Sequence, residues 1–416
     1  MQTHGDESSH RHPEWSEPTS SYPLDSTSVQ DSSSEFPILQ ADLINEILLK
    51  LPVKSLVKFK CVSKSWLHLI SSPKFVKSHL SISANNKGYT RHRFMLEFYP
   101  PKYLKDCSVS SLLNDHVTRA VDLDCPMEKS QNQSIGVVGS VNGLICLSIA
   151  EKDLFLWNPS IRKFKKLPPS LTGIFYAYGF GYDELHDDYK VVGITQDLSN
   201  DGSRHNVCKI YSLMNNSWEG EPFDDFQIAI KYFRSGMFVN GKLHWANISY
   251  KHFGYNNDWD IISVDLADGR WGEMEKPCYG EGNFNFIPCL GMLQNDLCIF
   301  CHHLRSHADV WVMKEYGVKE SWTKMFSIKY AGDPMGYSMF SPPFCMSSEG
   351  EFLFKNGSFM IYNPNDDSMR SPNVTNCDHL LEAKLYIESL VWPFISNGST
   401  DATTSKAAEA QMKTIL

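Results

Sequence analysis

Apolar residues near position 40 of the chain repeat with the period of a helix. One helical face carries aliphatic side chains at five positions: Leu43, Ile44, Ile47, Leu48 and Leu51. Asp42 can cap this helix, and Pro52 ends it. Two narrower apolar stripes follow with almost no loop, first at Leu56, Phe59 and Val62, then at Trp66, Leu69 and Ile70 before Pro73. We therefore expect three short helices within residues 35–80, with more apolar surface than so small a bundle can cover by itself.

From about residue 90 to residue 395 the pattern becomes that of short strands, and a unit of about 50 residues recurs. Two units open with the hairpin signals Asn142-Gly143 and Asn240-Gly241, and two more open with Asn295-Asp296 and Glu349-Gly350. The closing turns lie 57, 53, 49 and 48 residues apart, at Asn158, Asn215, Asp268, Gly317 and Asn365. About four strands per unit predict a β-propeller, for which six blades fit the length and seven is the alternative. A β-sandwich array would not need such even spacing.

The two ends of the chain have a different composition. The first 34 residues contain ten Ser and little aliphatic content, so we expect them to be disordered, and residues 396–416 look like a frayed tail. The N-terminal stretch has neither the apolar core of a signal peptide nor the composition of a transit peptide, and no run approaches 18 apolar residues. The 11 Cys are scattered without a framework, which is typical of reduced thiols. We expect a cytoplasmic or nuclear protein, or one present in both.

Charge separates residues 35–80 from the remainder of the chain. This segment holds seven Lys, no Arg and three acidic residues, so its net charge is +4, whereas the whole chain carries −9 and everything outside the segment therefore carries −13. A basic segment on an acidic chain favours an acidic protein partner. Nucleic acid is a weaker alternative because the chain is acidic overall and the segment lacks Arg. A solvated helix face is the plain alternative.

Residues 35–80 closely resemble an F-box. The matching motifs are Leu51-Pro52-Val53-Lys54-Ser55-Leu56, the stretch from Phe59 to Trp66, Leu69-Ile70 and Phe75, while Leu39-Gln40 stands where the family has Leu-Pro. The resemblance implies docking onto Skp1, the adaptor of a cullin-based ubiquitin ligase. An ordinary helical hairpin inside a larger domain is the alternative.

The residues that we assign to the Skp1 contact combine the apolar stripes with one lysine. They are Leu39, Leu43, Ile44, Ile47, Leu51, Pro52, Val53, Leu56, Lys58, Val62, Trp66, Leu69 and Ile70.

Residues 90–395 resemble the F-box-associated domain of plant F-box proteins, a group that includes F-box/kelch-repeat and S-locus F-box-like members. The resemblance is carried by GYDELHDDYKVV, WNPSIRKFKKLP, NGKLHW, VWVMKEYGVKESWTKMFSI and MIYNPN. The paired glycines of true kelch repeats are absent. Together the two resemblances imply a mostly β chain, with a small helical F-box at residues 35–80 followed by a kelch-like β-propeller.

Several groups of reactive residues have simpler explanations than catalysis or metal binding. Cys298 and Cys301, followed by His302 and near His303 and His307, have the spacing of a haem or zinc motif, but they also fit a buried strand in which cysteines are small core residues. The acidic loop from Asp183 to Asp188 fits a solvated turn. Six tryptophans recur at blade positions and favour a core over a sugar platform: Trp157, Trp218, Trp245, Trp271, Trp311 and Trp322. We expect no metal and no cofactor.

These patterns predict a substrate receptor without catalytic residues of its own. In this interpretation the F-box binds Skp1, the cullin scaffold joins through Skp1, and the propeller holds a target protein for ubiquitination and proteasomal degradation. The rival interpretation is a carbohydrate-binding or carbohydrate-oxidising propeller, in which the helical segment only packs against the rest. We expect contact with neither a membrane nor nucleic acid.

Target recognition is assigned to loops, because the strands of a closed propeller are paired and buried. Two polar insertions stand out, at residues 197–206 and 249–260. The candidate target-binding residues within them are Asp197, Arg204, His205, His252, Tyr255 and Trp259. The alternative is that both insertions are idle surface loops.

Overall fold

The computed structural model describes residues 41–98, 104–123, 125, 135–150, 153–169, 175–198, 204–222, 235–248, 259–279, 286–303, 306–329, 341–377 and 380–394. The stretches expected to be disordered, residues 1–34 and 396–416, lie outside these ranges. The chain divides into two compact units, residues 1–44 and residues 45–416. The described helices and strands belong to the second unit, except that the first helix begins at residue 41.

Four helices, rather than the three expected, open the described chain. They are α1 (Ala41–Lys50), α2 (Val53–Phe59), α3 (Lys64–Ser71) and α4 (Pro73–Ala84). Pro73 ends α3 as expected, but it is also the first residue of α4, a position where its missing N–H costs nothing. Ser63 and Ser72 cap α3 and α4 by accepting hydrogen bonds from Trp66 N and Phe75 N. Asp42 lies inside the first turn of α1 rather than ahead of it.

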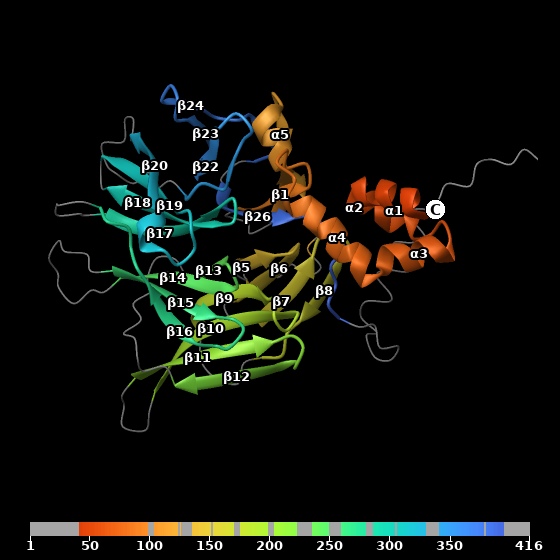
Figure 1. Cartoon of the computed structure of the whole chain (residues 1–416), viewed down its shortest axis with the longest axis horizontal. Helices are drawn as coiled ribbons and strands as arrows, with labels where there is room; N and C mark the ends of the chain where they lie inside the picture. The colour runs from red at the N-terminus through yellow and green to blue at the C-terminus, as the bar shows by residue number, and fades with distance from the viewer. Residues whose placement is uncertain are drawn as a thin grey trace, which may run out of the picture. The chain divides into compact units, whose positions relative to one another are not determined.

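Six four-stranded antiparallel sheets follow, and Figure 1 labels most of their strands. The first sheet contains β26 (Leu380–Ile387), β1 (His92–Phe98), β2 (Leu104–Ser108) and β4 (Val121–Asp122). The second contains β5 (Ile135–Val141), β6 (Leu144–Ile149), β7 (Asp153–Asn158) and β8 (Lys163–Lys166). The third contains β9 (Phe175–Asp183), β10 (Asp188–Leu198), β11 (Arg204–Ser212) and β12 (Ser217–Pro222).

The remaining three sheets continue in chain order. The fourth contains β13 (Met237–Val239), β14 (Lys242–Ile248), β15 (Trp259–Asp265) and β16 (Trp271–Met274). The fifth contains β17 (Phe286–Leu293), β18 (Asp296–His303), β19 (His307–Met313) and β20 (Trp322–Lys329), with a 3₁₀ turn at Lys319–Ser321. The sixth contains β21 (Cys345–Met346), β22 (Phe352–Asn356), β23 (Ser358–Asn363) and β24 (Ser368–Arg370).

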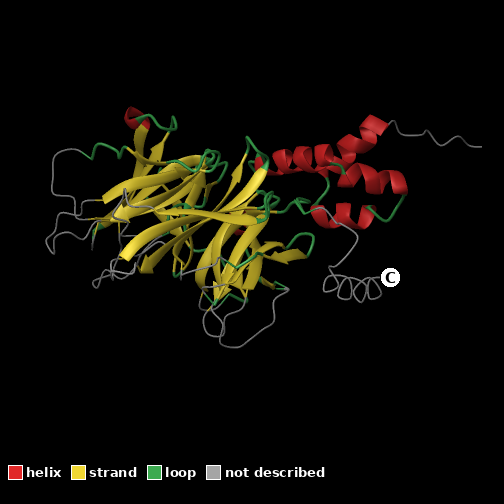
Figure 2. Cartoon of the chain, turned by 90° about the horizontal axis from the view of Figure 1, so that it is seen from below, coloured by secondary structure: helices red, strands yellow, loops and turns green. Residues whose placement is uncertain are grey.

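Short elements complete the described chain. Helix α5 (Val109–Asn114) follows β2, and β3 (Thr118–Arg119) pairs in parallel with β25 (Val374–Thr375). Figure 2 shows how strands dominate the chain after α4. None of the helices described combines the length and apolar content that crossing a lipid bilayer requires.

The sheets form a closed ring because six apolar clusters each join two successive sheets. Trp157 and Tyr386 share the cluster between the first and second sheets, and equivalent clusters join the second to the third and so on around the ring. The last cluster places Leu353 of the sixth sheet with Phe94 of the first. The structure is therefore a six-bladed β-propeller, which confirms the predicted fold and settles the blade number.

The hairpin turns explain most of the repeat seen in the sequence. Asn142 and Gly143 have φ of 55° and 81°, and Asn240 and Gly241 have φ of 50° and 75°, as a two-residue type I′ turn requires. The turn predicted at Asn295-Asp296 is wrong by one residue. Its central residues are Gln294 and Asn295, because Asp296 already pairs with Leu293 at the start of β18.

The first blade is closed by strands from both ends of the propeller sequence. β26 pairs antiparallel with β1, in a register that runs from His92 opposite Ile387 to Phe98 opposite Leu380. Arg93 of β1 and Tyr386 of β26 both contact the Asp106 carboxylate on β2. This pairing fixes the ring, because β1 would otherwise be an open sheet edge.

Candidate functional site

The helical segment has an interior of its own. Val53, Leu56 and Ile70 are almost completely buried, so these three predicted adaptor contacts are not accessible at the surface. Phe59 of α2 and Trp66 of α3 meet edge to face with ring centroids 5.5 Å apart. His79 of α4 is buried, and its Nε2 lies 2.9 Å from the carbonyl oxygen of Leu51.

Other apolar side chains of the same segment are exposed. Among the predicted contacts, Ile47 is 50% exposed, Val62 is 60% exposed, and Leu43, one turn before Ile47 in α1, is similarly open. Pro52 and Lys58 are exposed too. Four more predicted contacts are half-buried: Ile44, Leu51, Trp66 and Leu69. Leu39 lies outside the described residues.

The structure adds three exposed apolar residues that the sequence interpretation did not assign to the contact: Val57, Leu67 and Ile82. The helical period alone does not identify them, because a helix of two turns such as α2 has too few positions to fix which side faces inward. So many large exposed apolar side chains within four short helices are characteristic of a surface that another protein covers.

The same helical segment also carries exposed lysines. Lys50, Lys54, Lys58 and Lys64 are exposed, which agrees with the basic charge of the segment. Lys60 is half-buried, and burial followed by the nearby charge of Lys163 lowers its pKa. The segment can therefore offer apolar contacts together with several solvated positive charges.

The target-binding residues predicted in loops are only partly described. Asp197 and His205 are backbone partners near the ends of β10 and β11, and Arg204 is opposite Leu198. His252 and Tyr255 lie outside the described residues. Trp259 belongs to β15 rather than to a loop, and it packs in a core cluster against Phe286 with ring centroids 6.1 Å apart. The polar run before Trp259 concealed this strand start in the sequence.

A cavity of about 400 Å³ lies where the first strands of the blades converge. Its walls come from all six sheets or the segments that lead into them, including Val138, Phe180, Met237 and Leu290. Lys355, Glu382, Lys384 and His302 contribute polar groups. A mostly apolar cavity with a few polar groups is a common binding feature, and sequence periodicity gave no sign of it because its walls are distant along the chain.

The structure explains the groups that the sequence interpretation set aside. Cys298 and Cys301 lie in different core clusters on the two faces of β18, because residues three apart on a strand point in opposite directions. Asp183 stabilises the turn that follows it, because its carboxylate accepts hydrogen bonds from Leu185 N, His186 and Lys190 Nζ. Trp157 and Trp245 are buried in clusters between blades.

Comparison with known families identifies both parts of the chain. The sequence model of the F-box domain matches residues 36–78, and that of the F-box associated beta propeller domain matches residues 99–390. An F-box/kelch-repeat protein of Arabidopsis thaliana is 34% identical over 370 residues, which cover 85% of this chain and 96% of that protein. The F-box protein CPR1 of the same plant is 30% identical over 376 residues, covering 84% of this chain and 88% of that protein.

Solved structures resemble the chain only distantly. An oligogalacturonate lyase aligns with a TM-score of 0.39 at 6% identity, over 65% of this chain and 70% of that one. The SapL1 lectin aligns with a TM-score of 0.38 at 10% identity, over 70% of this chain and 99% of that one. Likenesses of this strength carry no functional argument, whereas the sequence matches extend over the helical segment and the propeller alike. The chain belongs to the plant F-box proteins that carry an F-box-associated β-propeller.

Proposed function

We propose that this chain is the substrate-recognition subunit of a Skp1–cullin–F-box ubiquitin ligase. The helical segment binds a Skp1-like adaptor, the cullin joins through that adaptor, and the propeller presents a target protein for ubiquitination and degradation. The chain itself supplies proximity: a tethered target reaches an effective concentration far above its free value. We place this assembly in the cytoplasm, the nucleus or both.

The observation that carries this proposal is the exposed apolar surface of the F-box segment. Ile47 and Val62 remain open to solvent although Val53, Leu56 and Ile70 of the same segment are buried. A segment with a satisfied core has no packing reason to expose large aliphatic side chains, and a protein interface needs such anchors. The exposed lysines of the same segment suit an acidic partner.

The test measures binding of the purified full chain to a Skp1-like adaptor by calorimetry. We expect Ile47→Gln combined with Val62→Gln to weaken binding by at least about 2 kcal/mol, roughly thirtyfold. Glutamine is a good helix former at Ile47 in α1, Val62 lies in the turn between α2 and α3, and both positions are exposed, so the fold and the net charge should be unaffected.

The matched control replaces two exposed apolar residues of the propeller, Met214→Gln with Val318→Gln. This control should bind the adaptor as tightly as the unmodified chain does. Unchanged affinity in the Ile47/Val62 variant, with both variants melting at the temperature of the unmodified chain, would contradict the proposed docking surface.

We further propose that the target is recognised by the loops at residues 197–206 and 249–260. Supporting this is the backbone pairing of Asp197 with His205, which places both residues next to the connection between β10 and β11. Replacing Arg204 and His205 together by alanine should slow target turnover in cells without changing adaptor binding. Normal turnover in cells would place recognition elsewhere, for example at the central cavity.

A further inference from the structure

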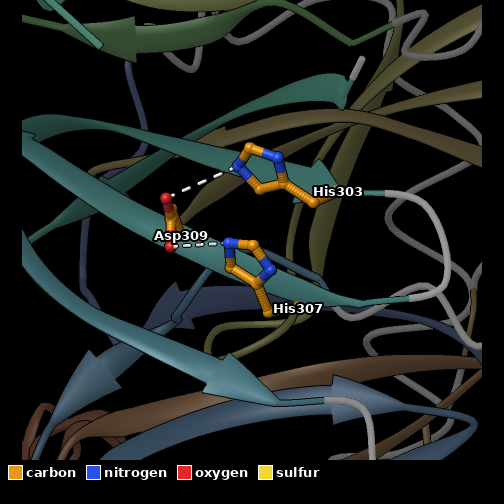
Figure 3. A group of neighbouring side chains, drawn as sticks. All are labelled: His303, His307 and Asp309. Carbon is orange, nitrogen blue, oxygen red and sulfur yellow. Dashed lines mark ion pairs between the residues drawn. The ribbon is translucent and has the colours of Figure 1, made fainter. Parts of the chain in front are cut away.

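His303, His307 and Asp309 converge at one end of the β18–β19 hairpin of the fifth blade (Figure 3). His303 is the direct cross-strand partner of His307, and Asp309 is two residues farther along β19. Residues two apart on a strand share a face, and so do direct cross-strand partners. The sheet register therefore places all three side chains on the same face of the blade.

The distances within this cluster suit a shared cation better than hydrogen bonds. His303 Nε2 lies 3.4 Å from Asp309 Oδ2, and His307 Nε2 lies 3.5 Å from Asp309 Oδ1. Both are longer than an ordinary N–H···O bond of about 2.7–3.2 Å. Two ligands of a tetrahedral zinc ion with bonds of about 2.0–2.1 Å are separated by about 3.3 Å, and each imidazole nitrogen lies near that separation from one of the two carboxylate oxygens.

The imidazole rings lie close together, and both would tilt to bring their in-plane lone pairs onto one ion. They stack with centroids 4.3 Å apart and planes 8° apart, and each directs its Nε2 toward the same carboxylate. Phe286 packs against His303 at a centroid distance of 5.3 Å and limits its rotation. Cys301, although opposite Asp309, is completely buried next to Tyr279 and takes no part.

Neighbouring polar groups orient the three side chains. Ser306 Oγ lies 2.6 Å from His307 Nδ1, and when it accepts that N–H the lone pair is left on Nε2. Ser327 Oγ donates to Asp309 Oδ1 at 2.7 Å. Partners of this kind, on the far nitrogen of a histidine and on a ligand carboxylate, are typical of metal sites.

Lys324 is the strongest argument for a plain ion-pair network, because its Nζ lies 2.8 Å from Asp309 Oδ2. That lysine accounts for the charge of the carboxylate. It does not account for two imidazole Nε2 atoms that face the same carboxylate at 3.4 Å and 3.5 Å, both longer than an ordinary hydrogen bond. The Lys324 side chain is partly exposed, so its ammonium can move into solvent when a cation takes its place.

We propose that His303, His307 and Asp309 bind a divalent transition-metal ion, with Zn²⁺ the best match. Two imidazole nitrogens and one carboxylate oxygen suit zinc, whereas Mg²⁺ and Ca²⁺ prefer oxygen ligands throughout. The partial exposure of His307 leaves a fourth position for water and a path for the ion to enter. The bound ion links β18 to β19 and so stabilises this end of the fifth blade.

The experiment titrates the metal-free full chain, prepared without an affinity tag, with Zn²⁺ by calorimetry and with Co²⁺ by visible spectroscopy. We expect the unmodified chain to give the intense d–d absorption of tetrahedral Co²⁺ and a rise in melting temperature with Zn²⁺. His307→Ala should remove the Co²⁺ signal and lower zinc affinity at least about tenfold, the loss that even outer partners of a metal site can cause.

Two further variants make the test specific. His186→Ala removes another half-exposed histidine that contacts an aspartate, and it should bind zinc as the unmodified chain does. Lys324→Met removes the competing cation and should raise zinc affinity. The proposal is overturned if His307→Ala, still folded by circular dichroism, retains the Co²⁺ spectrum and the zinc affinity, or if Lys324→Met lowers that affinity.

Discussion

The buried side chain of His244 meets two partners as a neutral imidazole. Its Nδ1 lies 3.1 Å from the carbonyl oxygen of Met237 and donates to it, while Nε2, 2.8 Å from the Tyr316 hydroxyl, accepts from that group. Burial lowers the pKa of His244 to about 4, and burial lowers the pKa of His92 to about 4 as well. Folding therefore depends on keeping both side chains uncharged.

The lowered pKa values of His244 and His92 predict that the protein becomes less stable as the pH falls. In the unfolded chain these histidines gain a proton below about pH 6.5, whereas in the folded chain they resist protonation down to about pH 4. The free energy of unfolding should be unaffected by either group above pH 6.5 and should fall as the pH drops toward 4, by about 3 kcal/mol for each histidine. Urea unfolding between pH 7 and pH 4.5 measures this loss.

His244→Gln should flatten the fall between pH 6.5 and pH 4.5, even if the variant is less stable at pH 7. The exposed His116→Gln serves as the matched control and should keep the full pH dependence. An identical slope in His244→Gln and the unmodified chain would show that this side chain does not carry the effect.

At the scale of single residues, sequence reasoning reaches the type of side chain but not its surroundings. The apolar stripes of the F-box segment are predictable, yet Val53, Leu56 and Ile70 turned out buried while Ile47 and Val62 are exposed. Helical periodicity identifies apolar positions without showing which of them neighbouring helices cover. The pairing of His244 with Tyr316 is out of reach for the same reason, since 72 residues separate them.

Two equivalent hairpin turns differ sharply in what surrounds their glycines. Gly143 and Gly241 both have left-handed φ, of 81° and 75°. A Cβ on Gly143 would lie 2.5 Å from the Ile387 carbonyl oxygen and would collide with Ser389 Oγ, whereas a Cβ on Gly241 would meet nothing within 4 Å. The turn between β5 and β6 is therefore pressed against the segment that follows β26.

Alanine at these two positions separates backbone strain from crowding. Gly241→Ala should cost about 1–2 kcal/mol of unfolding free energy, the price of a left-handed residue with a Cβ. Gly143→Ala should cost about 1–3 kcal/mol more because the Cβ displaces Ser389 and its neighbours. Chemical denaturation of both variants measures the difference. Equal losses of unfolding free energy in the two variants would show that the residues around Gly143 move aside for a Cβ at no cost.

The lysines of α2 and α3 should affect the rate of adaptor docking more than its final affinity. Lys54→Gln with Lys58→Gln should slow association at low salt, and the difference should shrink as salt screens charges beyond about 8 Å at physiological ionic strength. Stopped-flow mixing with a Skp1-like adaptor measures the association rate at each salt concentration. The control pair Lys314→Gln with Lys329→Gln removes the same charge from exposed propeller positions. Equal association rates for both pairs at low salt would mean that the helical lysines do not steer docking.

At the scale of elements, the turns were the most predictable feature. The Asn-Gly pairs at residues 142–143 and 240–241 specify type I′ turns locally, and the structure has both. The turn at Gln294-Asn295 was displaced by one residue because Asn295 takes its second central position, not its first. The sequence pattern predicts three helices and not four, because Pro73 signals the end of α3 while the same residue also starts α4.

The whole molecule depends on a contact that no local pattern reveals. The repeat in the sequence predicts the blades, but the first blade takes its β26 strand from nearly 300 residues farther along the chain than its β1 strand. Seven backbone pairs and the shared contacts of Arg93 and Tyr386 with Asp106 hold this closure together. The same blade contributes to two of the six clusters between sheets, so opening it exposes both.

A chain that ends at Cys377 tests how far the ring depends on this strand. Without β26, β1 becomes an unpaired edge, and Phe94 and Ile145 lose neighbours in two separate clusters. Since domains are stable by only about 5–15 kcal/mol, we expect the propeller to lose its cooperative thermal transition and to aggregate. A chain that ends at Phe394 keeps β26 and should melt like the full chain, while a peptide of residues 380–394 added to the shorter chain should restore part of the transition. Cooperative melting of the shorter chain at the full-chain temperature would show that the other five sheets are stable as an open arc.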